Sequence, residues 1–413
     1  MEETTPIVTI DEHHPPTTQR KLTSSSSISD LLHPLLLPPP ENIPFDMIVT
    51  ILLKLPVKSL LRMKSTCKPW NELISDPRFA RDHLRASASN PNRKRFLVTY
   101  RIIFENNEAQ SSLRDYPLST VFEKPLATSA AAASPRNPFP CSENLTDFLC
   151  GSCDGMFCMA TTKNCPILWN PSTGKFKQLP RVGRDNPLTF GFGYDRVSDS
   201  YKVVAMLNRG RIGKTPKFRV DHFVYTLGTD RDDDSWRKIH SLPSCFIDDN
   251  SGKFVSGTLN WLAFDGDNAN LLFIISLDLS TEKYQIIMPP VAKTDEGVEF
   301  LRSAVIKESL CIVANRQNDA DYWIMKEYGN ADSWNLLYRI PYVGGFPKII
   351  KFCMVPICVS DDGDEILLEY LGMLTVYNSK TGSFKASGVR FFTGSILAGV
   401  YTETLISPTL ESC

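Results

Sequence analysis

The sequence lacks any long apolar run. No stretch approaches the roughly 18 consecutive apolar residues of a membrane-spanning helix, and the apolar segment at 31–37 is short and interrupted by Pro34. The N-terminus begins Met1-Glu2-Glu3 and lacks the positive charge followed by an apolar segment that a secretory signal peptide carries. We therefore expect no membrane partner, a cytoplasmic or nuclear location, and eleven cysteines that stay reduced.

An excess of charge of one sign is also missing, since the formal net charge is −1. A nearly neutral chain gives no reason to expect nucleic acid as a partner. The charge is nevertheless uneven, because residues 54–95 contain eleven Lys or Arg against three Asp or Glu. Such a basic stretch is typical of a solvated helical face, and contact with an acidic protein surface is the alternative.

Motifs for catalysis are scarce. Of the six histidines, only His13 and His14 are close together in the sequence, and the sequence contains no phosphate-binding glycine loop, nucleophile elbow or His-Glu metal motif. Cys150, Cys153, Cys158 and Cys165 have no complementary histidine, so small buried side chains near the turn at Asp154 are a simpler interpretation than a zinc site. We expect no catalytic residue, no metal and no cofactor.

Length and composition indicate more than one folded unit. With 413 residues, 42% hydrophobic and 22% charged, the chain is too long for one ordinary domain and has enough apolar side chains for a large core. Residues 1–40 are rich in Thr, Ser and Pro, which predicts a disordered tail. A small helical module is expected at 41–88 and an all-β domain at 95–405.

The helical pattern begins near Ile43. Pro44 suits the first position of a helix, Asp46 complements the helix dipole, and apolar residues follow at positions 45, 47, 48, 51, 52 and 55. Pro56 ends this helix, and three further short helices are expected, the second at 57–63. Four short helices bury little core by themselves, so this module is expected to complete its core with a partner or a neighbouring domain.

From about residue 95 the pattern becomes β. Runs of β-branched and aromatic residues bounded by Gly, Pro, Asn or Asp predict strands, for example at 95–104, 201–207, 270–277 and 365–370. These runs keep no helical period, so we expect the rest of the chain to be built from strands.

A degenerate repeat runs through the β region. Asn170, Asp278 and Asn378 are each followed by a Thr three residues later and an aromatic residue after that, which predicts hairpin turns. The dipeptides Ser-Trp ending at Trp236 and Trp334 alternate with them. From Thr173 through Trp236, Thr281 and Trp334 to Thr381, the spacings are 63, 45, 53 and 47 residues. They are close to the roughly 40–50 residues of a propeller blade. The sequence therefore predicts an irregular, about six-bladed β-propeller.

Two regions resemble a known family. The segment 43–79, with Leu55-Pro-Val-Lys-Ser-Leu-Leu-Arg followed by Trp70 and Leu73-Ile-Ser-Asp-Pro, resembles the F-box of the large plant F-box family. Further motifs resemble that family's F-box-associated, kelch-like domain: Gly-Ser-Cys-Asp-Gly at 151–155, Trp-Asn-Pro-Ser-Thr-Gly at 169–174, Gly-Phe-Gly-Tyr-Asp at 191–195 and Gly-Thr-Leu-Asn-Trp at 257–261. The likeness covers roughly 42–405.

The likeness has three departures. Ile43 and Met47 stand where the family usually has Leu, and both are conservative apolar changes. Pro69 stands before the Trp where Ser or Arg is common, and proline is tolerated there only in the first turn of the third helix.

The resemblance implies a non-catalytic, substrate-recognition subunit of a Skp-cullin-F-box ubiquitin ligase. It would bind a Skp-type adaptor, and through it the cullin and RING subunits, and would recruit an unknown target protein. The expected adaptor-binding residues are Ile43, Pro44, Ile48, Ile51, Leu52, Leu55, Pro56, Leu60, Leu61, Trp70, Leu73 and Ile74. For each of them the alternative is packing in the module's own small core.

Two other functions remain open. One is an F-box-containing binding module that acts outside a ligase, and the other is a sugar-binding or enzymatic propeller with an appended F-box. The residues that bind the target carry no local sequence pattern, although loops on one face of the β-domain are expected to contain them.

Overall fold

The computed structural model describes residues 44–88, 90–103, 109–123, 148–160, 165–183, 187–211, 218–228, 235–240, 245–249, 251–266, 268, 271–292, 295–342, 354–370, 373–390 and 397–409. The predicted tail at 1–40 and Ile43 lie outside these residues. The chain divides into two compact units, Met1–Ile51 and Leu52–Cys413, and each is described by itself.

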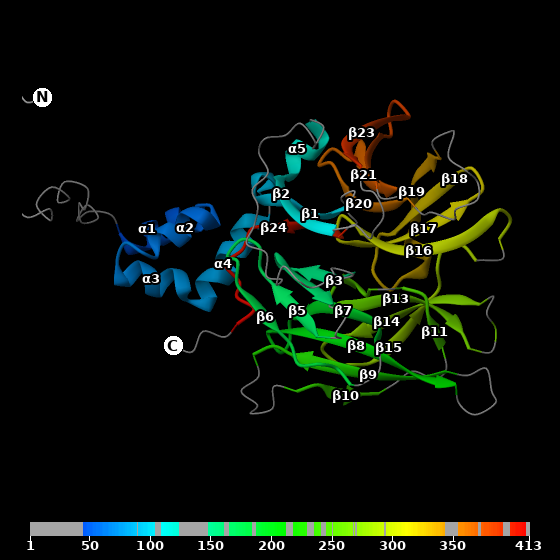
Figure 1. The fold of residues 1–413 in the computed structure, drawn as a ribbon, viewed down its shortest axis with the longest axis horizontal. Coiled ribbons are helices and arrows are strands. Elements are labelled where there is room, and N and C mark those ends of the chain that lie inside the picture. The colour runs from blue at the N-terminus through cyan, green and yellow to red at the C-terminus, as the bar shows by residue number, and fades with distance from the viewer. Residues whose placement is uncertain are drawn as a thin grey trace, which may run out of the picture. The chain divides into compact units, whose positions relative to one another are not determined.

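Four short helices open the described chain, as the sequence predicted (Figure 1). They are α1 (Phe45–Leu53), α2 (Val57–Met63), α3 (Lys68–Ser75) and α4 (Pro77–Ala88). Prolines mark their boundaries, since Pro44 precedes α1, Pro56 is the N-cap of α2 and Pro77 is the first residue of α4. Pro69 lies in the first turn of α3, where a missing N–H breaks no helical hydrogen bond.

Six antiparallel sheets in the described residues form the blades of a β-propeller. Blade 1 has β2 (Ala109–Pro117), β1 (Lys94–Ile103) and β24 (Leu397–Thr402); blade 2 has β3 (Phe148–Cys153), β4 (Met156–Ala160), β5 (Pro166–Trp169) and β6 (Phe176–Gln178); blade 3 has β7 (Pro187–Asp195), β8 (Ser200–Arg211), β9 (Phe218–Thr226) and β10 (Arg237–Ile239). Blade 4 has β11 (Cys245–Ile247), β12 (Lys253–Val255), β13 (Thr258–Asp265), β14 (Leu272–Asp278) and β15 (Tyr284–Ile287); blade 5 has β16 (Val298–Ile306), β17 (Ser309–Arg316), β18 (Asp319–Met325) and β19 (Trp334–Pro341); blade 6 has β20 (Val355–Val359), β21 (Glu365–Tyr370), β22 (Met373–Asn378) and β23 (Ser383–Arg390). The predicted six-bladed propeller is confirmed, with a short helix α5 (Leu118–Glu123) after β2.

Strands from both ends of the propeller sequence close the ring. The C-terminal strand β24 pairs antiparallel with β1, with Leu97 opposite Gly399, and β1 pairs in turn with β2 (Figure 1). The innermost strands β24, β3, β7, β12, β16 and β20 contact one another in that order around the ring. Blade 1 is therefore complete only when the last strand returns to the first.

The core lies between the blades. Trp169, Trp261 and Tyr322 are among the largest fully buried side chains, and each lies on a middle strand of its blade. All four residues of β5 are buried, as are six consecutive residues in β13 and in β14. Such strands are apolar on both faces because each blade is covered on both sides by its neighbours.

The repeat seen in the sequence falls once in each of blades 2 to 6. In blades 2, 4 and 6, the Asn or Asp ends or directly follows the strand before the outermost one and accepts the backbone N–H two residues later. The distances are 2.8 Å from Asn170 Oδ1 to the N of Ser172, 2.9 Å from Asp278 Oδ1 to the N of Ser280, and 3.1 Å from Asn378 Oδ1 to the N of Lys380. The predicted hairpin turns are confirmed.

In blades 3 and 5 the repeat position is a tryptophan at the start of the outermost strand. The indole Nε1 of Trp236 donates to the carbonyl of Pro180 at 2.8 Å, and that of Trp334 donates to the carbonyl of Met288 at 3.1 Å. Both acceptors follow the last strand of the preceding blade. Each tryptophan therefore joins its blade to the one before it.

Candidate functional site

Helix α1 exposes an apolar surface. Phe45, Met47 and Ile51 are 63%, 57% and 51% exposed, although large apolar side chains gain free energy by leaving water. Met47 and Ile51 are four residues apart and so share one face of the helix. Pro44 is also exposed and Ile48 is half-buried. Contiguous exposed apolar side chains commonly mark an interaction site.

Burial divides the predicted adaptor-binding residues into two groups. Leu52, Leu60 and Ile74 are at most 2% exposed, so their side chains pack inside this chain. The other predicted residues keep accessible surface: Pro44, Ile51 and Pro56 are exposed, and Ile48, Leu55, Leu61, Trp70, Leu73 are half-buried. Only this second group can offer side chains to a partner without unfolding. The exposed Phe45 and Met47 were not in the predicted adaptor-binding set.

Two buried basic side chains, a histidine and an arginine, hold the segment between α1 and α2. His83 Nε2 lies 2.9 Å from the carbonyl of Leu55, and Arg93 Nη2 donates to the carbonyl of Lys54 at 2.5 Å. Burial lowers the pKa of His83, which favours the neutral ring that donates one N–H to this carbonyl. Sequence reasoning did not find either contact, because the partners are 28 and 39 residues apart and no local pattern reports them.

Some basic residues of the stretch at 54–95 form ion pairs within the chain. Arg81 forms an ion pair with Asp199 at 2.5 Å, and Arg95 forms one with Asp115 at 2.6 Å. The exposed cations that remain on and around α2, α3 and α4 include Lys54, Lys58, Arg62, Lys68 and Arg78. A solvated face and a face for an acidic partner are both compatible with this arrangement.

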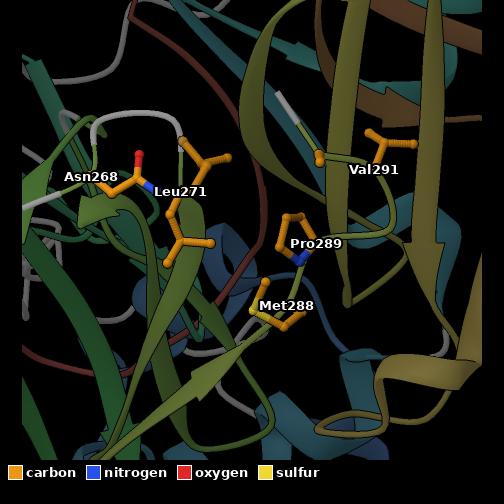
Figure 2. A pocket seen from close by; sticks show the side chains of 7 residues that line it. Asn268, Leu271, Met288, Pro289 and Val291 are labelled. Atoms are coloured by element: carbon orange, nitrogen blue, oxygen red, sulfur yellow. The ribbon is translucent and has the colours of Figure 1, made fainter. Parts of the chain in front are cut away.

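The propeller carries an apolar groove of about 260 Å³ (Figure 2). It is lined by Asn268, Leu271, Leu272, Met288, Pro289, Val291 and Ala292. Asn268 and Leu271 lie in the connection between β13 and β14, and the segment 288–292 follows β15. Figure 2 shows Met288 and Pro289 between Leu271 and Val291. Leu271 and Met288 are 42% and 48% exposed, so the groove opens to solvent.

The cysteine group near Asp154 consists of three buried thiols and the partly accessible Cys165. Cys150, Cys153 and Cys158 are buried, and burial raises the pKa of Cys153 well above its usual value. A thiol with a raised pKa is a poor nucleophile and a poor metal ligand. Within the residues described, no group of three or more His, Cys, Asp or Glu is placed to hold a metal ion, and no helix is both long and apolar enough to cross a membrane.

Comparison with known proteins matches both parts of the chain. A family model described as the F-box domain matches residues 40–82, and one described as the F-box associated beta propeller domain matches residues 115–385. An F-box/kelch-repeat protein of Arabidopsis thaliana is 29% identical over 385 residues, covering 89% of this chain and 96% of that protein. The Arabidopsis thaliana F-box protein CPR1 is 26% identical over 366 residues, covering 79% of each chain.

Similarity to solved structures is weak. The oligogalacturonate lyase of Vibrio parahaemolyticus gives a TM-score of 0.40 at 11% identity, covering 70% of this chain and 78% of that chain. A similarity of this size says nothing about function. An F-box followed by its associated propeller, shared with Arabidopsis F-box proteins, supports a non-catalytic role in substrate recognition.

Proposed function

Because the chain belongs to the F-box-associated β-propeller family of plant F-box proteins, we propose that it is the substrate-recognition subunit of a Skp-cullin-F-box ubiquitin ligase. The observation that carries the proposal is the exposed apolar surface of α1, which lies inside the F-box match. An F-box in general implies binding to a Skp-type adaptor. That adaptor would connect this chain to the cullin and RING subunits.

The adaptor-binding surface that we propose starts from Phe45, Met47 and Ile51. Burying one large apolar side chain contributes roughly 1.5–3 kcal/mol, so these three would contribute a large part of the binding free energy. The half-buried residues of the predicted set would extend this surface. Leu52, Leu60 and Ile74 would instead support it from inside the chain.

The protein would make and break no bonds in this role. It would hold a target lysine near the ubiquitin thioester carried by the conjugating enzyme, which replaces a diffusional encounter with a high effective concentration. The propeller would bind the target, and the F-box would fix it to the rest of the ligase.

The adaptor interaction can be tested with substitutions of exposed residues only. In Met47→Asp/Ile51→Asp, each carboxylate would have to be buried at the interface without a partner, so co-purification with a Skp-type adaptor should be lost while the melting temperature is kept. Val197→Asp is the matched control, because Val197 is 83% exposed on the turn between β7 and β8. Undiminished co-purification of the double variant would refute the proposed surface.

Truncation of a buried residue would not answer the same question. Leu60 is 0% exposed, and Leu60→Ala should cost about 2–5 kcal/mol of folding stability, so any lost binding would be explained by unfolding. Reconstituted ubiquitination with cullin and RING subunits then separates a ligase subunit from a binding module outside a ligase. Adaptor binding without any adaptor-dependent ubiquitin transfer would favour the latter.

A further inference from the structure

The groove between blades 4 and 5 has an apolar lining and a carboxylate at each end, and these two features indicate what kind of ligand it binds. We propose that this groove docks an extended, basic segment of the target protein, which inserts one bulky apolar side chain between Leu271 and Val291. The inference rests on the proposed function, because it assigns the target-binding site of the same receptor.

The groove lies where the propeller has longer connections. The opposite ends of the same strands are joined by two-residue turns, at Ser256–Gly257 between β12 and β13 and at Lys307–Glu308 between β16 and β17. The groove is instead formed by the connection from β13 to β14 and by the connection from β15 to β16. Binding residues tend to lie in such loops, where they are positioned by a rigid scaffold.

The size of the groove favours a side chain over a small-molecule ligand. Its volume of about 260 Å³ lies below the roughly 300–1,000 Å³ typical of small-molecule sites. Six of the seven lining residues are apolar, and Asn268 is the polar one. The wall at Met288 is fixed from the neighbouring blade, because its carbonyl accepts the indole N–H of Trp334. A fixed apolar groove of this size suits a single anchoring side chain.

Carboxylates flank both ends of the groove. Asp265 Oδ1 accepts the backbone N–H of Asn268 at 2.9 Å, and Asp295 Oδ2 accepts that of Ala292 at 2.9 Å. Asp295 is exposed. These hydrogen bonds place a negative charge directly beside the first and the last lining residues.

Two arginines of blade 5 are engaged in ion pairs. Arg302 forms an ion pair with Asp248 at 3.1 Å, and Arg316 forms one with Asp321 at 3.0 Å. Glu296 and Glu299, which follow Asp295, are exposed. Asp267 and Lys293, which precede Asn268 and follow Ala292 in the sequence, carry opposite charges and lie outside the described residues. The exposed carboxylates of Asp295, Glu296 and Glu299 complement a segment with Lys or Arg beside its apolar anchor.

A displayed library of random twelve-residue peptides tests the proposal on the purified full chain, with and without the Skp-type adaptor. Two variants change the groove: Leu271→Lys/Met288→Lys makes it cationic, and Asp265→Asn/Asp295→Asn removes the charges while keeping an oxygen for each backbone N–H. Val197→Lys is the control, since it adds a cation at an exposed position on another blade. Thermal unfolding of every variant confirms that the fold is kept.

We expect enriched peptides that combine one bulky apolar residue with flanking Lys or Arg. A synthetic copy should bind the cationic variant at least about tenfold more weakly, because two apolar contacts are lost and like charges oppose it. Each removed carboxylate should weaken binding by about two- to fivefold, and binding to the unchanged chain should weaken with added salt. The control should bind as the unchanged chain does.

Three outcomes would overturn the proposal: no enriched peptide, peptides without the basic-apolar pattern, or binding that the groove variants leave unchanged. A concentration-dependent dimer of the chain that Leu271→Lys/Met288→Lys abolishes would also overturn it, by assigning the groove to a second copy. Adaptor co-purification is read separately in the same samples. If the unchanged chain binds the peptide but not the adaptor, the result counts against the ligase role. If it binds the adaptor but not the peptide, the result counts against the groove alone.

Discussion

Replacing Gly155 with alanine should destabilise the propeller more than the same replacement at Gly257. Both glycines are the second residue of a two-residue turn that joins the innermost strand of a blade to the next strand, β3 to β4 and β12 to β13. Their φ angles are +77° and +82°, and the preceding residues Asp154 and Ser256 both have φ of 50°. The two positions therefore share a backbone conformation that favours glycine.

The surroundings of the two glycines differ. A Cβ at Gly155 would lie 2.2 Å from the carbonyl oxygen of Thr402 and 2.5 Å from Cγ2 of Thr404, whereas a Cβ at Gly257 would meet nothing within 4 Å. Thr402 ends β24, the strand that closes the ring, so relief of the clash requires that strand to move. The left-handed conformation costs roughly 1–2 kcal/mol at both sites, and overpacking adds about 1–3 kcal/mol at Gly155 alone.

Urea unfolding of the full chain, followed by tryptophan fluorescence, measures the difference. We expect a loss of about 2–5 kcal/mol for Gly155→Ala and about 1–2 kcal/mol for Gly257→Ala, read from the midpoint at an unchanged m-value. Equal shifts for the two variants would show that backbone strain alone is measured. In that case the close approach of the Asp154–Gly155 turn to the closing strand would have no energetic role.

Three further predictions concern polar side chains of the propeller. Burial lowers the pKa of His222 to about 4, so the free energy of unfolding should fall by up to about 3 kcal/mol as the pH drops from about 6.5 to 4. His222→Gln should flatten this part of the pH dependence of the urea midpoint. Lys202→Met should cost about 3–5 kcal/mol because it leaves the buried carboxylate of Asp195, 2.9 Å from Lys202 Nζ, without its cationic partner. A double-mutant cycle with Asp195→Asn should recover much of this loss in urea unfolding. Trp236→Phe and Trp334→Phe should each cost about 1 kcal/mol in the same assay through the lost hydrogen bond to the preceding blade, and no loss in either would refute the interblade role of the indoles.

The repeat could be found in the sequence because two of its elements require particular side chains. The hairpin turns at Asn170, Asp278 and Asn378 need a side-chain oxygen that accepts a nearby backbone N–H, and only a few residue types supply it. The interblade bonds of Trp236 and Trp334 need an indole N–H. A short sequence pattern can report such local requirements.

Blade 1 has no comparable pattern. Its strands come from the two ends of the propeller, and the pairing of Leu97 with Gly399 joins residues about 300 positions apart. Neither strand carries a side chain that identifies its partner. The sequence therefore indicated this blade only through the number of residues that remain before and after the repeat. The groove between blades 4 and 5 was missed for the same reason, because its two walls meet only after β14 and β15 have paired.

Helix α1 shows why spacing alone could not select the surface residues of the F-box. Seven of its nine residues, Phe-Asp-Met-Ile-Val-Thr-Ile-Leu-Leu, are apolar, so no continuous polar face marks the side that points to solvent. The predicted set therefore included Leu52, the one residue of this helix that is buried, and omitted Phe45 and Met47, which are the most exposed large ones. A helix that is apolar all round is normally covered on all sides. Since Leu52 is the one buried residue of α1, the remaining apolar surface is available to the adaptor that we propose.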